Sequence, residues 1–260
     1  MVLGRRVLLQ RALICYTTVA RSSDAPQIAL PPLRDGHRRL YLVRHGETDW
    51  NLDGRMQGST DNALNTNGQR QAQLLSDYLR GEPIELITSS NLQRAACTAD
   101  AVACVHPSAK RSASMPAFAE MCFGDLEGQR LEEARAVYDS YIASWRAGEN
   151  SRRWPGPRGE SPEDVASRGL AGLCELGLLP ASPGAARASG PRPSERTVLV
   201  AAHGRFNKIL IAALQGDLST ASDVKQGNTC INVLDFAPDG AVDVVRLDVR
   251  EHLRGERALA

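Results

Sequence analysis

Two short apolar runs in the chain each lead directly into a His-Gly pair. Residues 40–43 run into Arg44-His45-Gly46, and residues 197–202 run into His203-Gly204. Each run is as long as a buried strand, and a glycine directly after it lets the backbone turn. Open α/β sheets bind their ligands outside the carboxyl ends of their strands. The two pairs therefore predict a site that holds an anion and attacks it with an imidazole.

Strand and helix patterns alternate over most of the chain. Apolar runs predict strands over residues 39–44, 84–88, 197–202, 230–236 and 242–249. Start and stop signals, among them Asn65, Ser90 to Gln93 and Ser161-Pro162, predict helices over residues 66–80, 90–105, 131–147, 161–179 and 205–214. The alternation predicts an α/β fold, a three-layer α/β/α sandwich with a mostly parallel central sheet. The last two strands are expected to add an antiparallel edge.

At 260 residues the chain is long enough for one large α/β domain with extensions at its ends. We assign residues 1–37 to an N-terminal extension, residues 38–250 to the domain and residues 251–260 to a C-terminal tail. Residues 180–195 are rich in Pro, Ala, Gly and Ser, which predicts a flexible insertion. No run of 18 apolar residues occurs, so no membrane span is expected. A net charge of +1 gives no reason to expect nucleic-acid binding.

The N-terminal extension is basic. Residues 1–39 contain seven arginines and two aspartates, and the first acidic residue is Asp24. An Arg-rich, acid-poor start is typical of a transit peptide, which predicts a mitochondrial or plastid location. Arg11 interrupts the apolar stretch 7–20 and argues against a secretory signal. The main alternative is a disordered extension without targeting, and the protein would then be cytoplasmic.

Further segments extend the His-Gly pattern in a fixed order. They are Asn51 and residues 54–58, 64–68, 89–95, 120–128 and 228–229. With these segments the chain resembles the histidine phosphatase superfamily, phosphoglycerate-mutase-like branch (branch 1), from about residue 39 to about residue 249. The resemblance implies a phosphoglycerate-mutase-like fold and a phosphomonoester hydrolase that works through a phospho-histidine intermediate. It also implies a small phosphorylated metabolite as substrate and no cofactor.

The resemblance implies a role for each matching residue. His45 matches the family's nucleophile, and Glu120 matches its acid/base carboxylate. His203 matches the second histidine, which stabilises the transferred phosphoryl group. Arg44 and Arg94 match the two arginines of the family's phosphate clamp, whose N–H groups form forks that fit phosphate oxygens. The family's other substrate-binding residues fall on Asn51, Gln57 and Gly204.

Several positions keep a second interpretation. Asp125 and Glu127 are competitors of Glu120 for the acid/base role, although the spacing favours Glu120. Asn51 could cap a loop instead of binding phosphate. Arg205, directly after the second His-Gly pair, either adds a cation at the pocket rim or lies on the surface at the start of a helix.

The activity keeps alternatives as well. One is phosphoryl transfer of the phosphoglycerate mutase type, and another is a catalytically inactive phospho-ligand binder. Phosphoglycerate mutases of the family usually carry a longer insertion after the acid/base position. The sequence from Glu120 to Gly124 resembles the shorter, phosphatase-like form, which favours hydrolysis. His45, His203 and Glu120 could form a two-His-one-carboxylate metal site, but the neighbouring arginines would repel a cation, so no metal is expected. A homodimer is left open.

Overall fold

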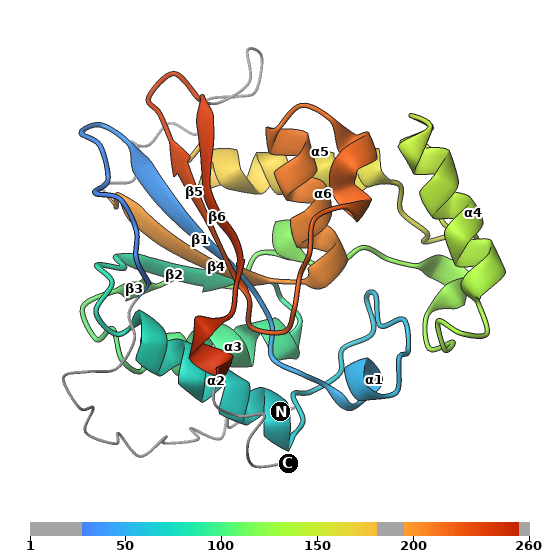
Figure 1. Ribbon diagram of the computed structural model, residues 1–260, viewed down its shortest axis with the longest axis horizontal. Coiled ribbons are helices and arrows are strands. Elements are labelled where there is room, and N and C mark those ends of the chain that lie inside the picture. The colour runs from blue at the N-terminus through green and yellow to red at the C-terminus, as the bar shows by residue number, and fades with distance from the viewer. Residues whose placement is uncertain (1–27, 181–194, 255–260) are drawn as a thin grey trace, which may run out of the picture.

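The central sheet has six strands in the order β3-β2-β4-β1-β5-β6 within residues 28–180 and 195–254, which the computed structural model describes. Figure 1 shows this sheet between two layers of helices. The strands are β1 (Arg38–Arg44), β2 (Leu86–Ser89), β3 (Lys110–Arg111), β4 (Thr197–Ala202), β5 (Ile231–Phe236) and β6 (Val242–Val249). β1, β2, β3 and β4 pair in parallel, whereas β5 and β6 pair antiparallel at one edge. The mixed sheet predicted from the sequence is confirmed.

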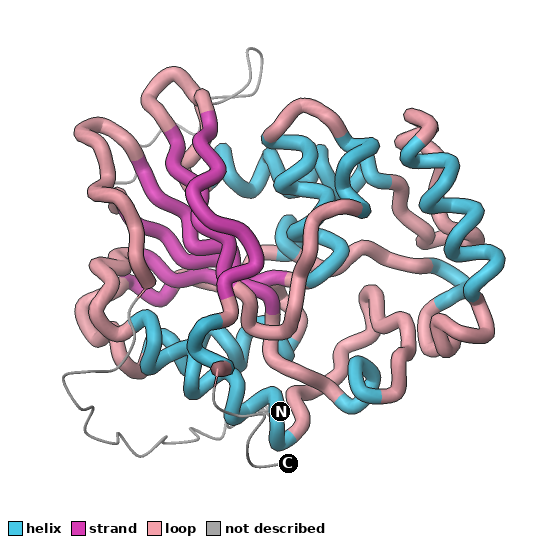
Figure 2. The backbone as a smooth tube through the Cα atoms, in the orientation of Figure 1, coloured by secondary structure: helices cyan, strands magenta, loops and turns pink. Residues whose placement is uncertain are grey.

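The helices form two layers because each central strand is apolar on both faces. They are α1 (Asp49–Leu52), α2 (Thr66–Leu79), α3 (Gln93–Ala103), α4 (Arg135–Arg146), α5 (Pro162–Glu175) and α6 (Gly204–Leu214). Along β1, Leu40 and Leu42 pack in one core cluster and Tyr41 and Val43 in the other. The first cluster includes residues of α5 and α6, and the second includes residues of α2 and α3. Figure 2 shows the same three layers, so the predicted sandwich is confirmed.

α4 lies beyond α6, away from the sheet (Figure 1). An aromatic cluster holds it there, centred on Trp154, which is fully buried. Tyr138 and Tyr141 of α4 stack on Trp154, with ring centroids 5.6 Å and 4.6 Å away. Trp145 meets the same ring edge-on at 4.9 Å. These buried aromatic contacts attach α4 to the segment that contains Trp154, between β3 and α5.

The register between β1 and β4 decides where the site lies. Arg44 is paired with Ala202, the last residue of β4. The ladder continues for one more bond, since the His45 N–H donates to the Ala202 carbonyl at 3.0 Å. Because both strands run in the same direction, the two His-Gly pairs leave the sheet side by side at its carboxyl edge.

Three helix boundaries differ from the sequence prediction, and the first is the start of α4, which lies at Arg135 rather than at residue 131 because residues 131–134 form turns. The predicted capping box at Ser90 was wrong, because α3 begins at Gln93 and the Ser90 hydroxyl accepts from the Leu92 N–H instead. The Gln93 N–H donates to Asp61, a carboxylate from a distant loop, at 2.7 Å. The helix predicted up to residue 179 ends at Glu175, and Gly177 follows with a positive φ of 69°. Such a residue terminates a helix because only glycine adopts that conformation without strain.

The ends of the domain include residues that the sequence placed in extensions. Ile28 is 5% exposed and packs in the same core cluster as Tyr41. The Arg39 guanidinium donates to the Pro31 carbonyl at 3.0 Å. At the other end, residues 251–253 form a 3₁₀ turn in which His252 is buried against Tyr78 of α2. Residues 28–37 and 251–253 therefore pack on the domain.

Other predictions fall outside the described residues. The flexible insertion lies mostly in residues 181–194, and the transit peptide lies mostly in residues 1–27. Both remain predictions. No helix in the described ranges is long and apolar enough to cross a membrane.

Removing residues 1–37 should destabilise the domain relative to removing residues 1–26, because only the longer deletion takes away Ile28 and the Pro31 carbonyl. Burying an isoleucine side chain contributes about 1.5–3 kcal/mol. For a domain of this size that corresponds to a Tm lower by roughly 3–12 °C. Thermal unfolding of the two truncated proteins measures the difference. Equal Tm values would show that residues 27–37 do not contribute to the fold.

Candidate active site

His45 and His203 face each other at the carboxyl ends of β1 and β4. Their ring centroids are 5.2 Å apart, and both side chains are buried. His203 is the residue before α6, so its backbone is extended while the helix begins directly after it. The strand register brings the two imidazoles together, as the sequence pattern predicted.

One hydrogen bond defines the tautomer of the neutral His45 ring. Its Nδ1 lies 2.7 Å from the carbonyl oxygen of Gly46. A carbonyl can only accept, so Nδ1 carries the proton and Nε2 carries the lone pair. No hydrogen bond from the described residues reaches Nε2. In the neutral ring, Nε2 is therefore the available nucleophilic nitrogen.

The turn after His45 is held by a very close approach of two backbones. A side chain on Gly46 would collide with the Gly68 carbonyl, and a side chain on Gly68 would collide with the Glu47 backbone. Asn65 caps α2 by accepting from the Gly68 N–H at 2.8 Å and donates to the Glu47 carboxylate at 3.0 Å. The start of α2 thus docks on the turn that carries the histidine. This explains why glycine is required at both positions.

Two arginines, the buried Arg94 and the partly buried Arg44, lie near His45. Arg44 donates to the Gln226 carbonyl at 2.7 Å, and Arg94 donates to the carbonyls of Thr60 and Gly58 at 2.6 Å and 2.8 Å. The Nε atoms of both guanidinium groups are buried without a hydrogen-bond partner in the described part of the chain, as are both ring nitrogens of His203. Buried polar groups are normally paired. Unpaired donors around a cationic pocket are the groups that an oxyanion would satisfy.

The environment keeps both imidazoles neutral. Burial is the main reason that the pKa of His45 lies well below its usual value of 6.5, and the charges of Arg94 and Arg44 lower it further. The pKa of His203 is lowered in the same way, first by burial and then by Arg94. Burial also lowers the pKa of Arg94, to about 10, so this guanidinium remains charged at neutral pH. The site therefore combines fixed positive charge with a deprotonated nucleophile.

Glu120 lies at the N-terminus of α6, in the same corner as His203. Its carboxylate accepts from the Phe206 N–H at 2.8 Å, from the Arg205 N–H at 3.1 Å and from the Met121 N–H at 2.9 Å. The first N–H groups of a helix have no partner within the helix and lie at the positive end of its dipole. The helix that begins at the second His-Gly pair thus holds the predicted acid/base carboxylate.

The two competing carboxylates are engaged elsewhere. Both oxygens of Glu127 accept from the Ser59 hydroxyl at 3.1 Å, and one also accepts from the Thr60 hydroxyl at 3.0 Å. Glu127 additionally accepts from the N–H groups of Ser59 and Phe123. These hydrogen bonds stabilise the loop whose Gly58 and Thr60 carbonyls accept from Arg94. Asp125 approaches the backbone of Gly156. Neither carboxylate shares the contacts that place Glu120 at the start of α6.

Asn51 and Gln57 serve local structure in the described chain. The Asn51 side chain accepts from the Thr48 N–H at 3.2 Å and completes a capping box at the start of α1. Gln57 is buried and accepts from the Thr48 hydroxyl at 2.9 Å. Capping, which the sequence left open for Asn51, is thus what the structure shows. Both residues remain only candidates for phosphate binding.

Three other predicted positions line the same corner. Gly204 packs on Arg44, since a Cβ there would stand 3.2 Å from the Arg44 Nε. Asn228 donates to the His45 carbonyl and to Asn51, both at 3.2 Å. The guanidinium of Arg205 contacts the Tyr138 hydroxyl of α4. Arg205 is partly buried between α6 and α4, so it is not a free surface residue.

Sequence reasoning missed the supports of the site. Gln226 supplies the carbonyl that holds Arg44, and its side chain bridges Asn207 and Asn232. Arg168 of α5 donates to the carbonyls around Glu120. These contacts join residues far apart in the chain, so no local spacing indicates them. Among the described residues, no group of three or more His, Cys, Asp or Glu side chains could hold a metal ion.

Comparison with known families decides the assignment. A family model described as "Histidine phosphatase superfamily (branch 1)" matches residues 40–248. The chain belongs to this family. The resemblance noted in the sequence is confirmed, and the protein is therefore an enzyme of phosphoryl transfer that acts on small phosphorylated metabolites.

Relatives in the family include phosphatases and mutases. The chain is 30% identical to the phosphatase PhoE of Bacillus subtilis over 217 residues, which is 83% of this chain and 97% of the relative. It is 36% identical to a glucosyl-3-phosphoglycerate phosphatase of Mycolicibacterium vanbaalenii, over 69% of this chain and 75% of the relative. A 2,3-bisphosphoglycerate-dependent phosphoglycerate mutase of Brucella melitensis is 32% identical, over 69% and 82%.

Solved structures share the fold. The mycobacterial glucosyl-3-phosphoglycerate phosphatase in complex with VO3 superposes with a TM-score of 0.67 and 26% identity, covering 82% of this chain and 100% of that one. The predicted sandwich thus has the architecture of histidine phosphatases.

Proposed function

We propose that the protein is a phosphomonoester hydrolase that transfers the phosphoryl group of its substrate to Nε2 of His45. The observation that supports this most directly is the Nδ1 contact with the Gly46 carbonyl, which leaves the lone pair on Nε2. A neutral imidazole is the form that can attack phosphorus, and burial beside two arginines favours that form. Covalent transfer splits one difficult hydrolysis into two easier steps.

The charge that develops on the transferred group is stabilised by the pocket. The Nε donors of Arg44 and Arg94 have no partner in the described chain and are already buried, so they need little reorganisation to bind equatorial phosphoryl oxygens. His203 offers an imidazole N–H from a ring whose centroid is 5.2 Å from that of His45. Positioning and electrostatic stabilisation supply most of the catalysis in phosphoryl transfer. These three side chains form the phosphate site in our proposal.

Glu120 handles the protons of both steps. In the first step the Nε2–P bond forms, the ester P–O bond breaks, and the leaving alkoxide takes a proton from Glu120. In the second step water attacks the phospho-histidine, gives its proton to Glu120, and His45 and inorganic phosphate are released. Three of the carboxylate's acceptor positions are used by peptide N–H groups, which leaves one oxygen position for the substrate.

Hydrolysis is favoured over mutase activity by the segment that carries Glu120. It runs directly from Glu120 through a single 3₁₀ turn at Gly124–Leu126, the short form predicted to be phosphatase-like. Relatives of similar identity are named as phosphatases and as phosphoglycerate mutases, so both products belong in the assay. We propose a phosphorylated sugar or glycerate derivative as the substrate class, in line with the glucosyl-3-phosphoglycerate phosphatase relative.

We expect turnover without a metal ion, because the guanidinium groups of Arg44 and Arg94 rather than a metal neutralise the phosphate charge in our proposal. Phosphate release from a panel of phosphorylated metabolites, measured after prolonged EDTA treatment, should equal that of untreated protein. The same samples show whether phosphoglycerate is isomerised instead of hydrolysed. Loss of most activity with EDTA, restored by Mg²⁺ or Zn²⁺, would contradict the metal-free mechanism.

Glu120→Gln should slow phosphoenzyme formation according to the leaving group. An alkyl phosphate needs a proton on its leaving oxygen, and general acid catalysis is worth about 10²–10⁴-fold. The phenolate of p-nitrophenyl phosphate leaves without that proton, so its rate should fall far less. Single-turnover measurement isolates this step from dephosphorylation. Glu127→Gln is the matched control and should show no such difference, whereas equal slowing of both substrates by Glu120→Gln would assign Glu120 to phosphate positioning.

A further inference from the structure

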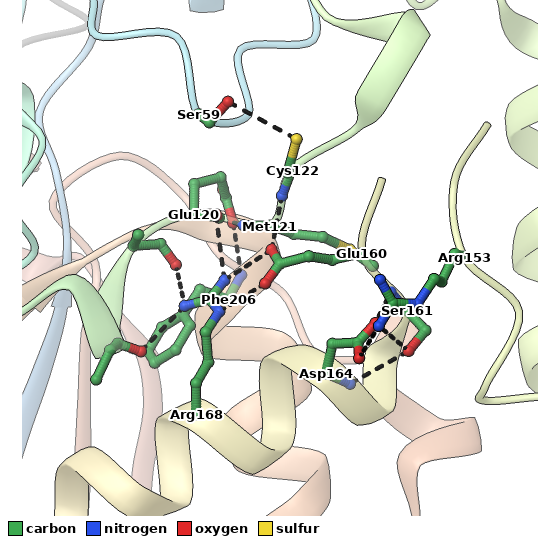
Figure 3. A network of polar contacts seen from close by, with 12 residues as sticks. Ser59, Glu120, Met121, Cys122, Arg153, Glu160, Ser161, Asp164, Arg168 and Phe206 are labelled. Atoms are coloured by element: carbon green, nitrogen blue, oxygen red, sulfur yellow. Dashed lines mark hydrogen bonds and ion pairs between the residues drawn. The ribbon is translucent and has the colours of Figure 1, made fainter. Parts of the chain in front are cut away.

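Arg168 of α5 uses all of its donors around Glu120. Its Nη1 donates to the carbonyls of Ala117 and Ala119 at 3.0 Å and 2.7 Å, and its Nη2 donates to the Glu120 carbonyl at 3.2 Å. The remaining donors bind Glu160, with Nε to Oε1 at 2.8 Å and Nη2 to Oε2 at 3.0 Å. A guanidinium has five N–H groups, so none is left over. Figure 3 shows Arg168 reaching from its helix toward both glutamates.

Glu160 holds the other side of the same segment. Its Oε2 accepts from the Cys122 N–H at 2.9 Å, and its own N–H donates to the Cys122 carbonyl at 3.0 Å. The backbone before and after Glu120 is therefore fixed by one ion pair, through carbonyls on one side and a peptide N–H on the other. Both members of the pair are only 22% exposed, which limits screening of the pair by solvent.

The pair also contacts the helix that receives the Glu120 carboxylate. The Arg168 guanidinium lies 5.4 Å from the ring centroid of Phe206. The Phe206 N–H is one of the donors to Glu120. Arg168 thus touches both the loop that carries the carboxylate and the helix start that binds it. A change at Arg168 would alter the distance between these two parts.

We propose that Arg168 and Glu160 are positioning residues that set the Glu120 carboxylate for proton transfer. The inference rests on the proposed acid/base role of Glu120. Arg168 itself is directed at backbone carbonyls and Glu160, and it acts on the reaction through Glu120. Lysine cannot replace it, because an ammonium has three donors and no planar fork. Misplacement of a catalytic group by about 1 Å can cost roughly 10²-fold in rate.

The test compares phosphoenzyme formation from an alkyl phosphate and from p-nitrophenyl phosphate in single turnover. Arg168→Met and Arg168→Lys should each slow the alkyl phosphate by roughly 10- to 100-fold and the aryl phosphate by much less. In a Glu120→Gln background, Arg168→Met should cause little further loss, because interacting residues are not additive. Glu160→Gln, a smaller change, should show the same selectivity and serves if the Arg168 variants fold poorly.

Arg153→Met is the matched control. Arg153 pairs with Asp164 at the start of the same helix at 2.6 Å, and its side chain is 60% exposed. It should leave the ratio of the two rates unchanged. Equal slowing of both substrates by Arg168→Met, or losses that add to those of Glu120→Gln, would overturn the positioning role while leaving Glu120 as the acid. A Glu120→Gln variant without leaving-group selectivity would instead overturn the acid/base assignment, and the positioning role with it.

Discussion

The parallel pairing of β1 with β4 is the constraint on which the site depends. It aligns Arg44 with Ala202, and the residues that follow are the two histidines. Both strands are central and buried, so a slip of one residue would turn every apolar side chain to the wrong face of the sheet. The cores on both faces of the sheet thereby fix the distance between two imidazoles at its edge. Burial at that edge, next to Arg44 and Arg94, then lowers the pKa of both rings.

The start of α6 links the second histidine to the proton-transfer carboxylate. His203 directly precedes this helix, and the first free N–H groups of the helix bind Glu120. The helix N-terminus holds a carboxylate as it would hold any anion. A phosphate bound between the histidines therefore lies near an ionisable group whose position is set by backbone donors. The ion pair of Arg168 with Glu160 extends this control to the loop on the other side of Glu120.

Local patterns in the sequence predicted the fold well. The last two strands and β4 were predicted nearly residue for residue, because apolar alternation and the turn at residues 238–240 are local signals. The Asn65 and Ser161 caps are confirmed, since each cap binds an N–H three residues later. The Ser90 prediction failed because the actual acceptor, Asp61, comes from a loop far away in the chain. A capping motif cannot show which distant carboxylate competes for the same N–H.

The residues of the site also divide into those that a local motif predicts and those that only long-range contacts determine. His45, Arg44 and His203 follow strand ends, so their motifs predict their places. Gln226, Arg168 and Glu160 stand in no motif that the sequence analysis recognised, and their contacts span many residues. The role of Ile28 in the core was also missed, because a run of three apolar residues between prolines is too short to show a periodicity.

The proposed phospho-histidine mechanism is tested most directly by trapping the phosphoenzyme during turnover and identifying the phosphorylated atom. Rapid quenching, peptide mapping and ³¹P NMR of the labelled peptide distinguish the two ring nitrogens. We expect acid-labile, base-stable phosphate on Nε2 of His45, since Nδ1 donates to the Gly46 carbonyl. Phosphate on Nδ1, on His203 or on a serine, cysteine or carboxylate would contradict it.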